Sequence, residues 1–221
     1  MKVGTDGVLL GAWTPVDHKP HSILDIGAGT GLIALMMAQR CDAPQIDALE
    51  IDASAHEQAT ENFEQSPWND RLFCYHASLD AYMDDLEDEE YDLIVSNPPF
   101  YSETVPSSSE SRDTARQNQS LPFSDLCEAA SVLLSEQGIF AVIIPIKEED
   151  GFIRLAMENG LYPQKITHVK GTPTAAVKRS LLAFSRNFLN EVPVNEIAIE
   201  IERHQYTAEF GELVKNFYLK V

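Results

Sequence analysis

The chain has 221 residues, 35 acidic against 16 basic side chains and 44% hydrophobic residues, which suits one α/β domain with a full core. It has no apolar run near the ~20 residues of a membrane helix, and its net charge of -19 argues against nonspecific nucleic-acid binding as the main activity. Its three widely spaced cysteines and six unclustered histidines predict reduced thiols in a cytoplasmic protein, without a zinc site or a disulfide framework.

Strands and helices alternate along the first half of the chain. Short apolar runs predict four strands, at residues 22–26, 45–49, 72–75 and 91–96. Helical spacing predicts helices at residues 32–40 and 53–65. Residues 80–92 carry eight acids and are expected to form a solvated helix or loop. This alternation predicts right-handed crossovers and a parallel sheet.

The second half continues the pattern. We expect helices at residues 124–134, 148–159 and 207–217, and strands at residues 138–144, 162–169, 178–184 and 196–202. The strands at 162–169 and 178–184 flank a Gly-Thr-Pro turn and are predicted to close the sheet as an antiparallel pair. Residues 101–122 are rich in Ser, Gln and charges and lack periodicity, which is typical of a functional or disordered loop.

A glycine-rich turn follows the first predicted strand. Asp25 is followed by Gly27, Gly29 and Gly31, with a helix directly after them. Glycine lets the backbone turn sharply and approach a ligand closely, and the GxGxG spacing differs from the GxGxxG of dinucleotide enzymes. Glu50 ends the next strand, where a carboxylate can accept both hydroxyls of a ribose. Together these residues indicate a nucleoside site.

Asn97-Pro98-Pro99-Phe100 ends the fourth strand, at the edge where open α/β sheets bind ligands. The two prolines remove two backbone donors, so the Asn97 side-chain oxygen and the Pro98 carbonyl remain as acceptors. Two acceptors beside the aromatic ring of Phe100 suit a planar group that bears an NH2.

The basic side chains are unevenly distributed. Residues 161–190 hold five bases and no acid, namely Lys165, Lys170, Lys178, Arg179 and Arg186. This stretch is either ordinary surface or a basic face for a phosphate-bearing partner, and charge alone leaves the two interpretations open.

Together the glycine turn, Glu50 and Asn97–Phe100 resemble the S-adenosylmethionine-dependent methyltransferases with an Asn-Pro-Pro-aromatic motif. Further blocks resemble the bacterial adenine N6-methyltransferases of valine tRNA, which modify adenosine 37. These blocks are Lys2–Trp13, Gln65–Trp68, Arg112 with Arg116, Arg179–Ser185 and Phe217–Leu219.

This resemblance implies a Rossmann-like class I methyltransferase fold in one domain, residues 1–221, with a cofactor half at about 1–95 and a substrate half at about 96–221. The implied sheet is seven-stranded and mostly parallel, with helices on both faces and an antiparallel closing strand. The implied enzyme is a monomer that uses S-adenosyl-L-methionine and receives a splayed base of the tRNA anticodon loop.

The resemblance also assigns the site residues. Asn97, Pro98 and Phe100 are the catalytic set, in which the two acceptors hold the amine and the ring stacks on the base. The cofactor set is Thr5, Asp6, Asp25, Gly27, Gly29, Gly31, Glu50, Ser78 and Asn97. The RNA set is Arg112, Arg116, Lys170, Lys178 and Arg179.

Two features depart from the family pattern. The chain begins at the Met-Lys-Val-Gly-Thr-Asp block, so we expect the family's preceding residues, which cover substrate and cofactor, to be missing. Ser78 stands where the family has an acid that meets the adenine of the cofactor, and Asp80 is an alternative for that role.

Several other functions share parts of this pattern. Enzymes that methylate guanine in ribosomal RNA or a glutamine amide in release factors carry the same motif, since all three targets present a planar NH2. An NAD-dependent oxidoreductase is disfavoured by the GxGxG spacing. A non-catalytic RNA-binding module is disfavoured by the intact Asn97–Phe100 motif.

Overall fold

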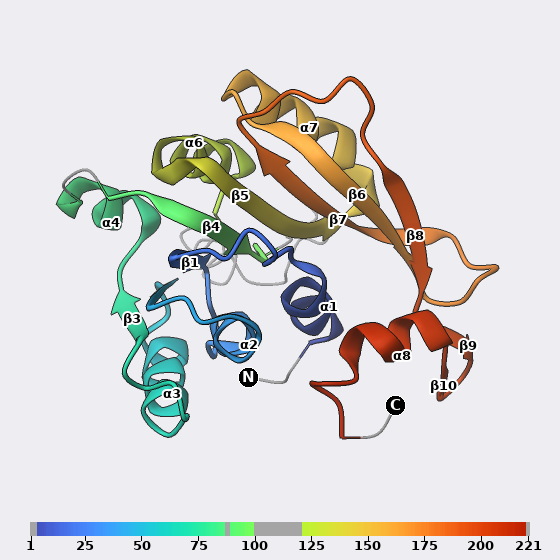
Figure 1. The fold of residues 1–221 in the computed structure, drawn as a ribbon, viewed down its shortest axis with the longest axis horizontal. Helices are drawn as coiled ribbons and strands as arrows, with labels where there is room; N and C mark the ends of the chain where they lie inside the picture. Colours follow the sequence, from blue (N-terminus) through green and yellow to red (C-terminus); the bar gives the residue numbers. More distant parts are fainter. Residues whose placement is uncertain (1–3, 87–88, 100–120, 220–221) are drawn as a thin grey trace, which may run out of the picture.

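A mixed β-sheet runs through the centre of the molecule, with helices on both of its faces (Figure 1). The computed structural model describes residues 4–86, 89–99 and 121–219. Within these ranges the main sheet has eight strands in the order β3-β2-β1-β4-β5-β7-β6-β8, and a two-stranded ribbon joins β9 to β10.

The bounds of the elements agree closely with the predicted alternation. The strands are β1 (Ser22–Ile26), β2 (Gln45–Glu50), β3 (Leu72–His76), β4 (Tyr91–Ser96), β5 (Leu134–Pro145), β6 (Tyr162–Lys170), β7 (Val177–Ser185), β8 (Val194–Ala198), β9 (Glu200–Glu202) and β10 (Gln205–Tyr206). The helices are α1 (Thr5–Trp13), α2 (Leu32–Arg40), α3 (Ala53–Glu64), α4 (Leu79–Asp85), α6 (Phe123–Leu133), the 3-10 turn η1 (Ile146–Glu148), α7 (Glu149–Glu158) and α8 (Ala208–Val214). None of these described helices has the length and apolarity needed to cross a membrane.

The first five strands along the chain form the parallel half of the sheet. β3, β2, β1, β4 and β5 are parallel neighbours, and Ile23 of β1 is in register with Ile46 of β2 and Leu93 of β4. β1, β2 and β4 are buried almost throughout, as expected of strands covered on both faces. Parallel strands end at one edge of the sheet, so Ile26, Glu50 and Ser96 meet at this carboxyl edge.

The second half is mixed. β7 is antiparallel to both β5 and β6, which confirms the predicted closing pair. The expected count of seven strands is one too low, because β8 adds to the outer edge as a parallel neighbour of β6. The predicted strand at 196–202 is divided between β8 and β9, since the backbone N–H groups of Ile199 and Glu200 turn back to the carbonyls of Lys170 and Gly171.

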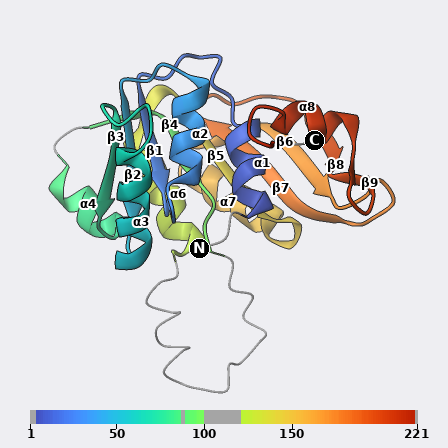
Figure 2. The same cartoon turned by 90° about the horizontal axis from the view of Figure 1, so that it is seen from below.

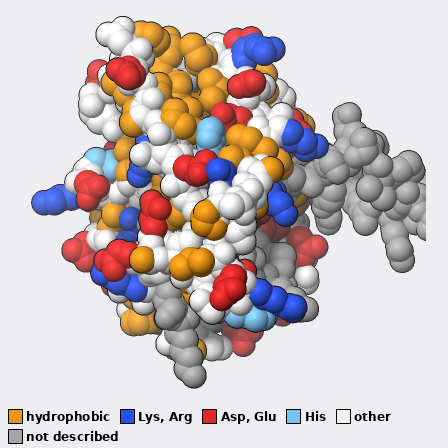
Figure 3. All heavy atoms as spheres, turned by 90° about the vertical axis from the view of Figure 1, so that its right-hand side faces the viewer, with side chains coloured by type: hydrophobic (Ala, Val, Ile, Leu, Met, Phe, Trp, Pro, Cys, Tyr) orange, Lys and Arg blue, Asp and Glu red, His pale blue; other side chains and the backbone are white. Residues whose placement is uncertain are grey.

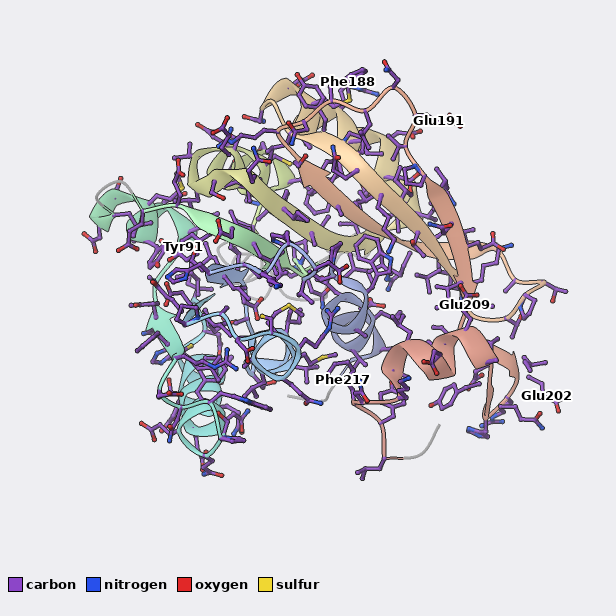
Figure 4. All side chains as sticks on the ribbon, in the orientation of Figure 1. Tyr91, Phe188, Glu191, Glu202, Glu209 and Phe217 are labelled. Atoms are coloured by element: carbon purple, nitrogen blue, oxygen red, sulfur yellow. The ribbon has the colours of Figure 1, made fainter. Side chains whose placement is uncertain are left out.

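Two buried clusters occupy the two faces of the sheet. α1, α2, α3 and α8 contribute to one cluster, and α4, α6 and α7 contribute to the other. Figure 2 shows α2, α1 and α8 on the same side of the sheet. At the left of Figure 4, Tyr91 begins β4, and its hydroxyl donates to Asp47 Oδ2 of β2 at 2.7 Å. This contact joins the start of β4 to β2 across the intervening strand β1.

Candidate active site at the carboxyl edge of the sheet

The glycine turn folds back over the end of β2. The backbone N–H groups of Gly27 and Ala28 both donate to the carbonyl of Leu49, at 3.0 and 2.9 Å. Gly27, Gly29 and Gly31 have φ angles of +75°, +59° and +76°, a region that favours glycine. The sequence of this turn is therefore dictated by its backbone geometry.

Gly27 and Gly31 differ in the space around them. A Cβ atom on Gly31 would lie 2.4 Å from Cε1 of Phe63, so close packing against α3 excludes any side chain there. A Cβ atom on Gly27 would have no neighbour within 4 Å. The turn thus offers open space beside the Gly27 backbone, which fits the close approach of a bound cofactor.

Glu50 connects the glycine turn with the segment after β2. Its Oε2 accepts a hydrogen bond from the backbone N–H of Gly29 at 2.7 Å, and its Oε1 accepts one from Asp52 N–H at 2.8 Å. The residue is 8% exposed. A carboxylate has about four acceptor positions, so both oxygens can still accept hydroxyl donors from a ribose.

Asp25 lies beneath the turn and is fully buried. Its Oδ2 accepts a hydrogen bond from Ala34 N–H of α2 at 3.1 Å, while Oδ1 has no partner among the described residues. Burial raises the pKa of the Asp25 carboxyl to about 7, and the nearby charge of Glu50 adds to this effect. Asp25 thus links the end of β1 to the start of α2 beneath the turn.

The raised pKa of Asp25 predicts a pH-dependent stability. Between about pH 4 and pH 7 the folded protein retains a proton that the unfolded chain has released, so the stability from this group is lost as pH rises. At about 1.4 kcal/mol per pH unit, the loss amounts to a few kcal/mol.

We expect Asp25→Asn, which keeps the acceptor for Ala34, to remove this contribution. Urea unfolding of both proteins at pH 4, 5, 6 and 7 measures it. The difference between the two curves of unfolding free energy against pH measures the contribution of residue 25, and parallel curves would contradict the assignment.

Asn97 follows β4 directly and lies beside the glycine turn. The buried Ser96 hydroxyl donates to the carbonyl of Ile26 at 2.8 Å and so ties the end of β4 to the end of β1. Asn97 is half-buried, and no described residue forms a hydrogen bond with its side-chain amide. Pro98 is buried, whereas the predicted stacking residue Phe100 lies outside the described residues. The structure therefore brings Asn97, Pro98 and the glycine turn together.

Ser78 has a structural role at the end of the neighbouring strand. Its hydroxyl accepts a hydrogen bond from Ala81 N–H at 3.2 Å and caps α4. The hydroxyl can still donate one hydrogen bond, but much of its capacity as an acceptor is used. Asp80 is exposed in the first turn of the same helix. Both residues lie close to the end of β3, where Glu50 and His76 are paired in register.

Two of the three described basic residues of the RNA set form ion pairs. Arg179 Nε binds Asp6 Oδ2 at 2.8 Å, and Lys170 Nζ binds Glu196 Oε1 at 2.8 Å. Lys178 is exposed and has no ion pair among the described residues. Arg112 and Arg116 lie outside the part of the chain that the structure describes.

A bulge in β7 sets the position of Lys178. Val169 pairs with Arg179, but the next residue, Lys170, pairs with Val177, so Lys178 is the extra residue. In a regular strand, side chains alternate between the two faces of the sheet, so Lys178 and Arg179 would point in opposite directions. A bulge changes the direction of side chains, and here both residues line one pocket. The sequence pattern gave no signal of this bulge.

The two other bases of residues 161–190, Lys165 and Arg186, contact neighbouring parts of the fold. Lys165 Nζ lies 4.7 Å from the ring centroid of Trp13, and Arg186 donates to the carbonyls of Ser131 and Leu134 at the end of α6. We expected Thr5 and Asp6 to bind the cofactor. In the structure they line the same pocket as Lys178 and Arg179, and no residue of the glycine turn contributes to this pocket. The ion pair of Asp6 with Arg179, 173 positions apart, is a feature that sequence reasoning missed.

The described part of the chain holds no group of three or more His, Cys, Asp or Glu residues arranged for a metal ion. The site therefore consists of a glycine turn, two carboxylates with different environments, an amide without a described partner and a local basic surface.

Comparisons with known proteins agree with this geometry. Residues 8–144 match the family model "Methyltransferase small domain". A tRNA1(Val) (adenine(37)-N6)-methyltransferase of Flavobacterium johnsoniae is 64% identical over 221 residues, which cover 100% of this chain and 94% of the relative. Proteins of the same name from Flavobacterium psychrophilum and Christiangramia forsetii are 65% and 56% identical, over 100% of this chain and 94% and 92% of the relatives.

Solved structures share the fold at lower sequence identity. A predicted O-methyltransferase of Agrobacterium tumefaciens superposes with a TM-score of 0.74 at 18% identity, covering 96% of each chain. A putative RNA methyltransferase of Pyrococcus horikoshii gives a TM-score of 0.58 at 15% identity, covering 80% of each chain. These likenesses confirm the expected class I methyltransferase fold.

Proposed function

The chain belongs to the tRNA1(Val) (adenine(37)-N6)-methyltransferases, and from this premise we propose which of its residues carry out the reaction. The enzyme transfers a methyl group from S-adenosyl-L-methionine to N6 of adenosine 37 in tRNA1(Val). The observation that carries the residue assignment is the position of Asn97, which Ser96 holds beside the glycine turn.

The cofactor side of the site is the glycine turn together with Glu50. When bound, S-adenosyl-L-methionine supplies an electrophilic methyl group on a sulfonium centre. Gly27 leaves open space at the turn, Glu50 accepts the ribose hydroxyls, and Asp25 supports the turn from below. Gly29 and Gly31 shape the turn, and Ser78 or Asp80 faces the adenine. We place Thr5 and Asp6 on the substrate side, because they line a pocket together with Lys178 and Arg179 and without any residue of the glycine turn.

The catalytic side is Asn97 with Pro98. The exocyclic amine of adenine is a poor nucleophile because its lone pair is delocalised into the ring. Hydrogen bonds from this amine to the Asn97 side-chain oxygen and the Pro98 carbonyl hold it in place and favour a tetrahedral nitrogen. Positioning and electrostatics then lower the barrier, and no strong general base is needed. Phe100 completes the proposed set as the stacking ring.

The tRNA backbone docks on the local basic surface at the carboxyl edge. Figure 3 shows that Lys and Arg side chains on the side of β8, β9, β10 and α8 are interspersed with acidic and apolar ones. A protein of net charge -19 repels tRNA as a whole, so contacts must be made at a few points. We assign these to Lys178, with Lys170 and Arg179 beside it and Arg112 and Arg116 on the loop.

We expect Lys178→Ala to reduce the salt dependence of tRNA binding. Because Lys178 has no ion pair among the described residues, its charge is available to a phosphate, and its loss should lower the slope of log Kd against log salt by about one. Cofactor affinity should stay unchanged. Lys19→Ala, an exposed lysine before β1, is the matched control. An unaltered slope in Lys178→Ala would place the RNA elsewhere.

The assignment of the reaction is tested by methylation of total tRNA from a strain that lacks the enzyme, followed by mass spectrometry of the nucleosides. N6-methyladenosine at position 37 is the expected product. Absence of N6-methyladenosine from the treated tRNA would contradict the assignment, and the same assay with ribosomal RNA or a release factor as substrate would then test the other enzymes with the same motif. We further propose that the enzyme acts as a cytoplasmic monomer, where tRNA is available.

A further inference from the structure

A pocket of about 340 Å³ lies at the carboxyl edge, and neither Asn97 and Pro98 nor the glycine turn lines it. It lies between the start of α1, the turn from β6 to β7, and the segment from β10 to the end of α8. Pockets of this size accept small organic groups such as nucleosides. The proposed roles place the tRNA backbone at the basic residues of this pocket, and they assign nothing to its aromatic residues.

The wall of the pocket is aromatic on one side. Tyr206, Phe210 and Tyr218 form a cluster in which the Tyr206 centroid lies 5.0 Å from that of Phe210 and 5.9 Å from that of Tyr218. Phe210 is fully buried and anchors the cluster, whereas Tyr206 remains 36% exposed. A ring that is fixed from behind and open in front is a suitable surface for a nucleobase to stack on.

Charged side chains complete the lining, and one of them, Glu200, is the strand partner of Tyr206. Lys178 enters the pocket from the bulge of β7, and Arg179 is held by Asp6 of α1. The hydroxyl of Thr5 and the carboxylate of Asp6 offer acceptors for the edge of a base. The lining thus combines a stacking ring, a cation for a phosphate and acceptors for a base, which are the three elements of a nucleotide.

The distance from the catalytic residues fits an adjacent nucleotide. Ser96 of β4 pairs with Val142 of β5, and Pro145 of β5 pairs with Arg179 of β7. Asn97 and Arg179 are therefore separated by two strand spacings across the sheet and by about two residues along β5, on the order of 12 Å in all. When the target adenosine is splayed out toward Asn97, a neighbour in the same RNA strand is within reach of the pocket.

We infer that this pocket receives a nucleotide that directly flanks adenosine 37, with its base against Tyr206 and its phosphate beside Lys178. The inference rests on the proposed function, because it takes the anticodon loop as the substrate. It adds a point of substrate selection, since the pocket contacts a base that is not modified. Sequence-specific recognition of RNA commonly uses splayed loop bases in this way.

The test uses tRNA1(Val) ligated from two pieces, so that one flanking nucleotide, on either side of adenosine 37, is abasic. We expect one of the two abasic tRNAs to bind wild-type enzyme roughly 5- to 150-fold more weakly than intact tRNA. Tyr206→Leu should weaken the binding of intact tRNA by a similar factor, and Tyr206→Phe should restore it. Tyr206→Leu should bind the sensitive abasic tRNA no more weakly than it binds intact tRNA, because both changes remove the same contact.

Phe188→Leu is the matched control, because Phe188 is also exposed and lies far from α8, where Glu209 is labelled (Figure 4). It should leave tRNA affinity unchanged. Additive effects of Tyr206→Leu and the abasic nucleotide, or equal binding of both abasic tRNAs and intact tRNA, would overturn the inference. If Tyr206→Leu does not fold, the abasic series with wild-type enzyme still decides.

Methyl transfer by the wild-type enzyme to intact tRNA distinguishes a failure of the pocket from a failure of the proposed function. Transfer to adenosine 37 without any dependence on Tyr206 or the flanking bases would overturn the pocket alone. Absence of transfer to adenosine 37 would overturn the proposed function together with the pocket that rests on it.

Discussion

Asn97→Ala is expected to lower the rate of methyl transfer by about 10²- to 10³-fold, the usual effect of losing one preorganised catalytic hydrogen-bonding group. The side chain has no hydrogen-bond partner among the described residues, so its removal breaks no hydrogen bond between them. The remaining Pro98 carbonyl still accepts from the amine, which explains why some rate should survive. Single-turnover transfer to tRNA with saturating cofactor measures the effect.

The controls for Asn97→Ala are the two binding affinities. Cofactor affinity should stay close to that of the wild type, because the glycine turn and Glu50 are untouched, and tRNA affinity should fall little. Thermal unfolding should be nearly unchanged, since Ser96 still holds the end of β4. Near-normal turnover at saturating tRNA would show that Asn97 has no catalytic role.

Glu50→Ala is expected to weaken cofactor binding by roughly 5- to 150-fold for each ribose hydrogen bond that it removes. The loss has two physical causes, because Glu50 also accepts the backbone N–H groups of Gly29 and Asp52. Without these contacts the glycine turn loses its anchor to β2, and the protein should also be destabilised, by about 1–3 kcal/mol for each unsatisfied donor that stays buried. Calorimetric titration with S-adenosyl-L-methionine and urea unfolding measure the two effects.

Asp52→Ala is the control that separates the two causes. Asp52 accepts from the N–H groups of Ser54 and Ala55 at the start of α3, so its removal costs local hydrogen bonds without removing the carboxylate of Glu50. We expect this variant to lose stability while cofactor affinity changes much less. Unchanged cofactor affinity in Glu50→Ala would rule out the ribose contact.

The fold was largely predictable because its strands are short apolar runs bounded by residues that end them. The glycines after Ile26 and the prolines after Asn97 mark the ends of β1 and β4 directly. The helix α1 was not predicted, because Gly7–Trp13 are all buried and the segment shows no apolar and polar faces. The short strand β8 was predicted only approximately, since most of its residues are exposed at the edge of the sheet.

The positions of the motif residues in the fold were predictable, but the contacts that position them were not. The glycine turn, Glu50 and Asn97 were placed at the carboxyl edge from local spacing, because each lies at the end of a strand or directly after it. The bond from Ser96 to Ile26 and the pair of Asp6 with Arg179 join residues 70 and 173 positions apart, and no local pattern reports such distances. The same reason hid the aromatic pocket, which combines residues from both ends of the chain.

The bulge of β7 also bears on which chain lengths the fold tolerates. β5 pairs with β7 only as far as Arg179, so Lys178 contributes no pairing to that neighbour. A chain that lacked residue 178 would bring Val177 opposite Lys170 and Arg179 opposite Val169 in an uninterrupted ladder with β6. The pairing of β6 with β7 would then be more regular here, but the exposed cation of Lys178 would be lost. The pairing of the sheet therefore does not require residue 178, whereas the proposed contact with tRNA does.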